Sequence, residues 1–179
     1  MFESEAVAAT VELKLTNNLR TALDHAFEDA QRCVREDGGM SPFTIICTSD
    51  GFDVAEHSGA STDDVYNSVR ALLAQEMPEA YVLVYDGFIE TDAGRSDAVL
   101  AEVAKRGDAL AYLLAMTYED TDEGVVFAPS YLSAGTAKQL YPRGTKPIVS
   151  GLVALAEERE RAAAEAEGGP EIEVEDADE

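Results

Sequence analysis

The chain has 179 residues, of which 46% are hydrophobic and 27% charged, as expected for a globular protein. Its 36 acidic residues against 13 basic ones give a net charge of −23 at pH 7. Because nucleic-acid binding depends on Lys and Arg that neutralise phosphates, this balance argues against a nucleic-acid ligand. The acidity has two interpretations: a solubilising surface, suited also to a salt-rich cytoplasm, or a surface that meets a basic partner.

The opening MFESEAVAAT lacks the basic and apolar regions of a signal peptide, so we expect a cytoplasmic protein. No apolar run approaches the roughly 18 residues of a membrane span. Cys33 and Cys47 are the only cysteines, and we expect both to be free thiols. There is no CxxC motif or Cys/His cluster, so the sequence predicts no metal site.

The first predicted helix runs from about residue 16 to residue 36. Thr16 or Asn17 can cap its start, and Gly38–Gly39 supply a left-handed stop. Its apolar residues recur at three- and four-residue spacing: Leu15, Leu19, Ala22, Leu23, Ala26, Phe27, Ala30, Cys33 and Val34. We expect residues 1–166 to form a single domain, with the first ~10 residues flexible.

A β-hairpin is the clearest local signal. The segments FTIICT and FDVAEH flank Asp50–Gly51, a dipeptide that favours a two-residue turn. That loop would place Cys47 opposite Val54 and Ile45 opposite Glu56. A second helix is predicted from Ser61 or Thr62 to the residue before Pro78. Its expected buried stripe consists of Val65, Val69, Leu72, Leu73 and Met77.

Residues 80–91, 96–105 and 108–119 predict a three-stranded antiparallel meander, because short turns join them. Helix is the alternative for the last two segments, but Gly107 interrupts them and the three lengths match. Both faces of this meander carry large apolar side chains, so both need a cover. We expect the two helices on one face. The C-terminal helix, a second copy or a partner would cover the other.

The C-terminal third adds a short apolar run at Val125–Phe127, then a loop rich in Pro, Gly and Ser, and a helix from about Pro147. Residues 167–179 are predicted to form a disordered acidic tail. The sequence therefore predicts an α+β fold with an antiparallel sheet of about five strands and two or three helices. The order of elements is α-β-β-α-β-β-β-(β)-α.

Three carboxylates fall inside predicted strands: Asp86, Glu90 and Glu102. A buried unpaired carboxylate is costly, so these side chains should be exposed or paired. The natural partners at the turns are Arg95, Lys105 and Arg106. The alternative is a polar binding face on the sheet, although Asp86 and Glu102 should point to opposite faces.

A basic cluster lies in the segment Ser133–Lys146, where Lys138, Arg143 and Lys146 occur within nine residues. The segment lacks the phosphate-binding pattern GxxxxGK[ST]. It is either a tether for the last helix or a site for an acidic group or partner. His25 and His57 have no neighbouring nucleophile or metal signature, so we interpret both as structural. The sequence predicts no catalytic residue and no cofactor.

The order helix, hairpin, helix, meander, helix resembles the roadblock domain of dynein light chains and bacterial GTPase-regulating proteins, one of the profilin-like folds. The resemblance covers about residues 16–160 and includes FTIICTSDGFDVAEH as the first hairpin. It implies a non-enzymatic scaffold that dimerises and binds a small GTPase or a motor subunit. It transfers no functional residue.

The sequence thus favours a non-enzymatic cytoplasmic protein-interaction or dimerisation module whose partner is another protein or a second copy. Two alternatives stay open. One is an acidic inhibitor or immunity-type protein that binds a basic partner. The other is a ligand-binding protein or enzyme that uses the loop Ser133–Lys146.

Overall fold

The computed structural model describes residues 16–59 and 61–146. The chain divides into two compact units, Met1–Pro147 and Ile148–Glu179, and the described residues all lie in the first. The predicted helix from Pro147, the acidic tail, the domain boundary at residue 166 and the first ~10 residues, expected to be flexible, lie outside the described residues.

The first two predicted helices are present, and their ends lie within one residue of those predicted. Helix α2 spans Asn17–Asp37, and the hydroxyl of its N-cap Thr16 accepts a hydrogen bond from Leu19 N. Gly38 ends it with φ 76°, a left-handed conformation that favours glycine. Helix α3 spans Thr62–Glu76, and its N-cap is Ser61.

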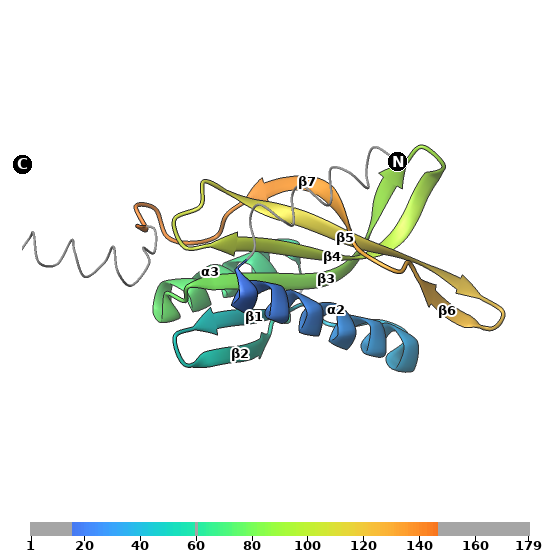
Figure 1. The fold of residues 1–179 in the computed structure, drawn as a ribbon, viewed down its shortest axis with the longest axis horizontal. Coiled ribbons are helices and arrows are strands. Elements are labelled where there is room, and N and C mark those ends of the chain that lie inside the picture. Colours follow the sequence, from blue (N-terminus) through green and yellow to red (C-terminus); the bar gives the residue numbers. More distant parts are fainter. Residues whose placement is uncertain (1–15, 60, 147–179) are drawn as a thin grey trace, which may run out of the picture. The chain divides into compact units, whose positions relative to one another are not determined.

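The described residues form a sheet of seven strands, two more than the five or so expected. They are β1 (Phe43–Thr48), β2 (Gly51–Glu56), β3 (Ala80–Thr91), β4 (Gly94–Lys105), β5 (Leu110–Thr121), β6 (Gly124–Phe127) and β7 (Leu132–Lys138). The order is β2-β1-β3-β4-β5-β6, with β7 also paired with β5, and every pair is antiparallel (Figure 1). The hairpin and the three meander strands are confirmed.

The segment after β6, predicted as a loop, instead contains strand β7. Strand β6 pairs with the second half of β5 and β7 with the first half, so together they act as one interrupted partner strand. The register of β7 shifts opposite Leu113 and Leu114. The sequence did not predict β7 because its small residues and its register shift disrupt the alternation of apolar and polar residues by which strands are recognised.

The register predicted for the first hairpin is wrong by two residues. Cys47 lies opposite Phe52, and Ile45 lies opposite Val54. The loop is Ser49–Asp50, because the Thr48 hydroxyl closes the turn by accepting from Asp50 N (3.3 Å) and donating to Gly51 O (3.2 Å). A shift of two keeps the same side chains on each face, so the predicted burial is unaffected.

The same four-residue turn closes two more hairpins. In each, a Thr hydroxyl accepts from the backbone N two residues on and donates to the O of a Gly three residues on. The turns are Thr91–Gly94 between β3 and β4, and Thr121–Gly124 between β5 and β6. Gly51, Gly94 and Gly124 all have positive φ, between 112° and 143°. Side chains with a β-carbon rarely adopt that region, which explains glycine there.

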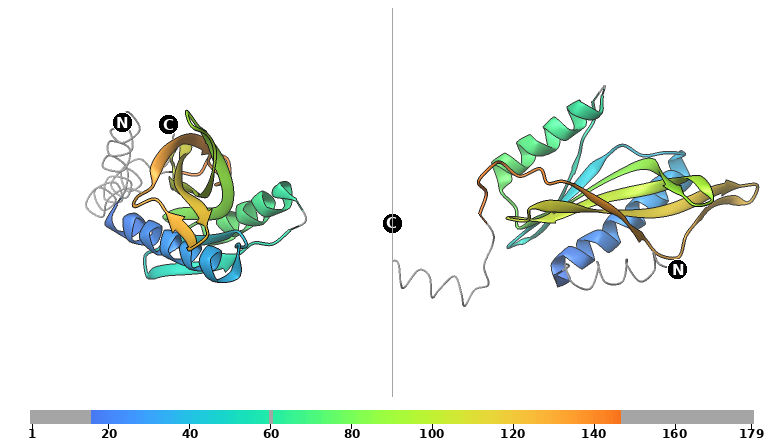
Figure 2. Two further views of the ribbon diagram at one scale, coloured as in Figure 1. Left: turned by 90° about the vertical axis from the view of Figure 1, so that its right-hand side faces the viewer. Right: turned by 90° about the horizontal axis from the view of Figure 1, so that it is seen from above.

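The two helices cover opposite faces of the sheet, which corrects the expectation that both lie on one side (Figures 1 and 2). Helix α2 packs on the face of Ile45, Val82, Val84, Val99 and Leu114, where most of the core lies. We call it the α2 face. Helix α3 packs through Val69 and Leu73 on the other face, against Ile46, Tyr81 and Leu83. We call that the α3 face.

The chain returns over the α3 face after β7 and closes part of it. The backbone N of Leu140 donates to the Tyr81 hydroxyl (3.0 Å), and the Tyr141 hydroxyl donates to Pro78 O (2.8 Å). Tyr81 and Tyr141 also make an edge-on ring contact at 5.4 Å. These contacts fix the segment beyond β7 to Pro78, just before β3, and to Tyr81 at its start.

Candidate functional site

Glu102 is a carboxylate buried in the middle of the sheet. It lies on β4 between Leu83 on β3 and Leu113 on β5, and only 2% of it is exposed. Its Oε2 accepts hydrogen bonds from the hydroxyls of Tyr66 on α3 and Tyr85 on β3, the latter at 2.6 Å. Its Oε1 is buried and has no hydrogen-bond partner among the described residues.

The hydroxyl groups of Tyr66 and Tyr85 have raised pKa values. Burial and the hydrogen bond to Glu102 raise the pKa of Tyr66 to about 12. The pKa of Tyr85 is raised too, mainly by burial and then by Glu102. Both phenols therefore keep their protons at neutral pH and remain donors to the carboxylate.

A second buried polar group, His57, also joins α3 to the sheet. Its Nε2 lies 3.0 Å from Thr44 Oγ1 on β1, and its Nδ1 lies 2.8 Å from Ser68 Oγ on α3. Burial lowers the pKa of His57, so the neutral ring is favoured. The structural interpretation of His57 fits these contacts, because both ring nitrogens have hydroxyl partners.

Asp86 and Glu90 lie apart from Glu102, on the α2 face of β3 and exposed. Asp86 accepts a hydrogen bond from the Tyr118 hydroxyl (2.6 Å). Arg95 lies opposite Glu90 in the register, but its guanidinium stacks over the Phe88 ring at 3.6 Å. The donors to Asp86 and Glu102 are thus tyrosines, which corrects the expectation of arginine and lysine partners.

The basic cluster does not assemble with these carboxylates. Lys138 is the last residue of β7, Arg143 and Lys146 follow in the turn region, and all three are exposed. None of their side chains bonds to another residue that the structure describes. Arg106, another proposed partner, donates to Met77 O (3.0 Å) at the end of α3.

The open edge of the sheet is strand β2, which sequence reasoning did not single out. The backbone N of His57 donates to Pro42 O (2.8 Å), and alternate residues of an antiparallel strand point the same way. The main-chain groups of Asp53 and Ala55 therefore face β1, and those of Phe52, Val54 and Glu56 face outward. No other strand among residues 16–59 and 61–146 pairs with this side of β2.

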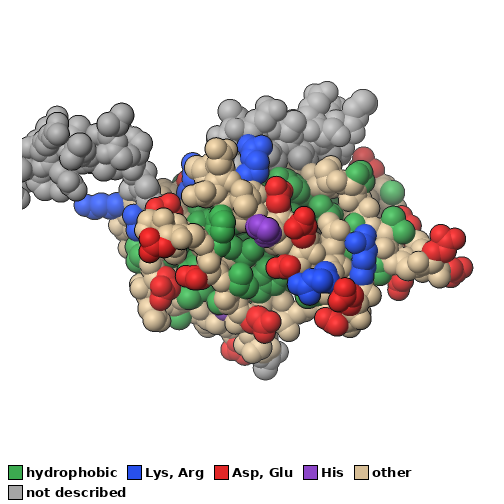
Figure 3. Space-filling view, turned by 60° about the horizontal axis from the view of Figure 1, so that its bottom comes forward, with side chains coloured by type: hydrophobic (Ala, Val, Ile, Leu, Met, Phe, Trp, Pro, Cys, Tyr) green, Lys and Arg blue, Asp and Glu red, His purple; other side chains and the backbone are tan. Residues whose placement is uncertain are grey.

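Hydrophobic side chains are exposed along this edge. Phe52 is 40% exposed and Val54 62% exposed, and both lie on the α2 face. The side of the molecule with β2 and α2, at the bottom of Figure 1, shows hydrophobic side chains surrounded by carboxylates and by some Lys and Arg side chains in the space-filling view (Figure 3). We call Gly51–Glu56, with its outward backbone groups and the side chains of Phe52 and Val54, the β2 edge.

The other edge of the sheet, formed by β6 and β7, is protected against pairing with another chain, whereas β2 is not. On β6, Arg35 from α2 donates to Val125 O (3.4 Å), and its guanidinium lies 5.0 Å from the Phe127 ring. On β7 the register shift breaks the regular ladder. Charged covers and bulges are the usual means by which sheet edges avoid pairing with other chains. The ladder of β2 with β1 is regular over six residues.

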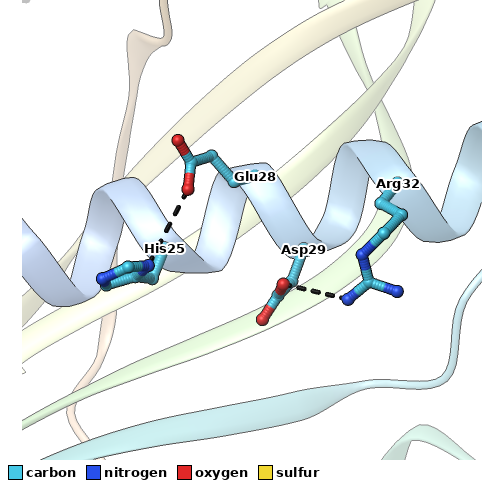
Figure 4. A network of polar contacts seen from close by, with 4 residues as sticks. All are labelled: His25, Glu28, Asp29 and Arg32. Carbon is cyan, nitrogen blue, oxygen red and sulfur yellow. Dashed lines mark hydrogen bonds and ion pairs between the residues drawn. The ribbon is translucent and has the colours of Figure 1, made fainter.

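The chain segment that contains the β2 edge carries only acidic charges. Residues 36–69 contain seven acidic residues and no Lys or Arg. Helix α2, by contrast, carries its own internal pairs on the exposed side, His25 with Glu28 at 3.7 Å and Arg32 with Asp29 at 3.0 Å (Figure 4). The exposed carboxylates of Asp50, Asp53 and Glu56 have no basic neighbour within the hairpin formed by β1 and β2.

Among the described residues, no group of three or more His, Cys, Asp or Glu could hold a metal ion. Neither described helix is long and apolar enough to cross a membrane. Comparison of the chain with protein-family models, curated proteins and solved structures finds no match.

Proposed function

We propose that this chain is a non-enzymatic protein-interaction module and that the β2 edge is its binding element. The observation that carries the proposal is the combination found only there in the described sheet edges: a regular ladder, outward backbone groups, and the exposed Phe52 and Val54. Adding a strand to such an edge supplies main-chain hydrogen bonds, and the alternate side chains supply specificity.

The polar groups buried elsewhere have roles in the fold. Glu102 with Tyr66, and His57 with Ser68, join α3 to the sheet. The exposed bases Lys138, Arg143 and Lys146 do not converge with a buried carboxylate. The β2 edge is therefore better supported as the binding element than the loop Ser133–Lys146. A cytoplasmic setting and the roadblock-like order of elements, which implies self-association, stay predictions.

Amide hydrogen exchange combined with solution mass tests the proposal. In the monomer, the outward amides of Phe52 and Val54 should exchange fast, and the amide of Asp53, bonded to β1, slowly. Protection of Phe52 and Val54 that grows with protein concentration, together with a dimer by light scattering, would show self-pairing. Slow exchange of both in a dilute monomer would refute the proposal, because the edge would then be covered within the chain.

A further inference from the structure

We propose that the β2 edge takes an extended basic segment of another protein as an added antiparallel strand. This inference rests on the proposed function and names the partner's chemistry. The segment would place apolar side chains against Phe52 and Val54 on the α2 face. It would place Lys or Arg against Asp53 on the α3 face and against Glu56 at the end of the strand.

The alternation of the strand sets this pattern. Successive side chains of β2 point to opposite faces, so Phe52, Val54 and Glu56 share one face while Asp53 and Ala55 share the other. In an antiparallel pair, residues directly opposite each other lie on the same face. A partner strand with apolar residues opposite Phe52 and Val54 and bases opposite Asp53 and Glu56 therefore matches both faces at once.

A second copy fits the edge less well. The two-fold register that places Phe52 against Val54 of the other copy places Asp53 opposite its own symmetry mate, and like charges directly opposite destabilise a pair. Moving the axis by one residue, to Val54, sets the Glu56 carboxylate beside Phe52. Two chains that each carry −23 also repel each other. A basic segment removes all three penalties.

The acidic segment that contains β2 extends the attraction beyond the strand. The stretch 36–69, with seven acids and no Lys or Arg, includes β2 and the exposed Asp63 at the start of α3. Opposite charges steer association and raise its rate, and this contribution falls as salt screens it. Binding of a basic strand should thus weaken with salt, whereas self-association of the acidic chain should strengthen.

The probe is a fluorescein-labelled peptide long enough to pair with all six residues of β2, with valine opposite Phe52 and Val54 and lysine at the other positions. One control peptide replaces each lysine by glutamate and another replaces each by glutamine. A third has proline at alternate positions and cannot complete the ladder. Fluorescence anisotropy with the full chain, at low and high salt, measures binding of each peptide.

Three variants of the chain locate the binding. Val54→Pro removes an outward donor that β1 does not use, and edge strands tolerate proline there. Asp53→Lys reverses the charge opposite the partner's base. Asp92→Lys makes the same change in net charge at the exposed β3–β4 turn and serves as its matched control. Thermal unfolding of each variant confirms that it is folded.

We expect the lysine peptide to bind and the glutamate and proline peptides not to bind. Val54→Pro should abolish binding, and Asp53→Lys should weaken it by about tenfold or more, while Asp92→Lys changes it little. If the glutamine or glutamate peptide binds as tightly and Val54→Pro still abolishes binding, edge pairing stands and the basic partner is wrong. If no peptide binds and the chain forms a dimer that Val54→Pro dissociates, the occupant is a second copy. If no peptide binds a monomeric chain, both the partner class and the proposed function fail.

Discussion

Removing either phenol that donates to Glu102 should destabilise the protein measurably. Tyr66→Phe or Tyr85→Phe deletes one hydroxyl and leaves the ring in place, so the change isolates a hydrogen bond to a carboxylate that is only 2% exposed. Such a bond contributes about 1.5–3 kcal/mol, because water cannot enter to replace it. The double variant should cost more than the sum, since Glu102 then has no donor among the described residues.

Tyr118→Phe is the matched control. Its hydroxyl donates to Asp86 at 2.6 Å, the same donor and acceptor types, but Asp86 is exposed and water can replace the phenol. We expect a loss within about 0.5 kcal/mol, typical of a surface substitution. The comparison therefore separates burial of the acceptor from the chemistry of the bond.

Urea unfolding followed by circular dichroism measures these losses. With a slope of about 2 kcal/mol per molar urea, a loss of about 2 kcal/mol lowers the midpoint by about 1 M. The melting temperature should fall by about 3–12 °C, at about 2–4 °C per kcal/mol for a chain of this length. If Tyr66→Phe and Tyr85→Phe destabilise no more than Tyr118→Phe, Glu102 is hydrated and the argument from its burial is refuted.

Three further predictions concern buried groups. Burial raises the pKa of Cys47 from 9.0 to about 11, so between these pH values the folded chain keeps a proton that the unfolded chain releases. The free energy of unfolding should therefore fall by about 2–3 kcal/mol as pH rises through that window. In Cys47→Ala, the urea midpoint should decrease less over the same pH range. Burial lowers the pKa of His57, so the unfolded chain takes up a proton at a higher pH than the folded chain. The free energy of unfolding should therefore drop as pH falls below about 6.5. In His57→Asn, the unfolding free energy measured between pH 7 and pH 5 should lack this drop. A β-carbon at Gly87 would lie 2.9 Å from Leu100 Cδ1, so Gly87→Ala should lower the free energy of unfolding by about 1 kcal/mol. Gly39→Ala is the control, because no atom lies within 4 Å of a β-carbon built there, and it should cause no such loss. Equal losses in the two variants would show that the contact with Leu100 does not destabilise Gly87→Ala.

Local signals predicted the helices and the long strands. Thr16 and Ser61 accept from the backbone of the first turn, as N-caps do, and Gly38 adopts the left-handed conformation that ends α2. These features depend on a few neighbouring residues, so one sequence is enough to find them. The hairpin register needed more, because the Thr48 hydroxyl, which fixes the loop one residue earlier than Asp50–Gly51 suggests, competes with the turn preference of that dipeptide.

The candidate sites depend on contacts between residues that are far apart in the sequence, and sequence spacing does not reveal such contacts. Glu102 was recognisable as a carboxylate in an apolar strand, but Tyr66 reaches it from a helix 36 residues away in the chain. Sequence proximity favours Arg95 as the partner of a nearby acid, yet it stacks on Phe88, since a guanidinium gains from an aromatic face as well as from a carboxylate. Only the fold decides between such partners.

The β2 edge shows how one residue can serve two purposes. A charged residue on an edge strand disfavours pairing between identical chains, and Asp53 would do so because it would lie opposite its own symmetry mate in the most apolar register. The same carboxylate attracts a strand that carries a base at the matching position. Asp53→Asn therefore separates the two effects: it should weaken binding of the lysine peptide and, at high protein concentration, allow self-association that the wild-type chain resists. If Asp53→Asn leaves both unchanged, the charge of Asp53 selects neither partner, and the exposed Phe52 and Val54 alone would have to explain any binding.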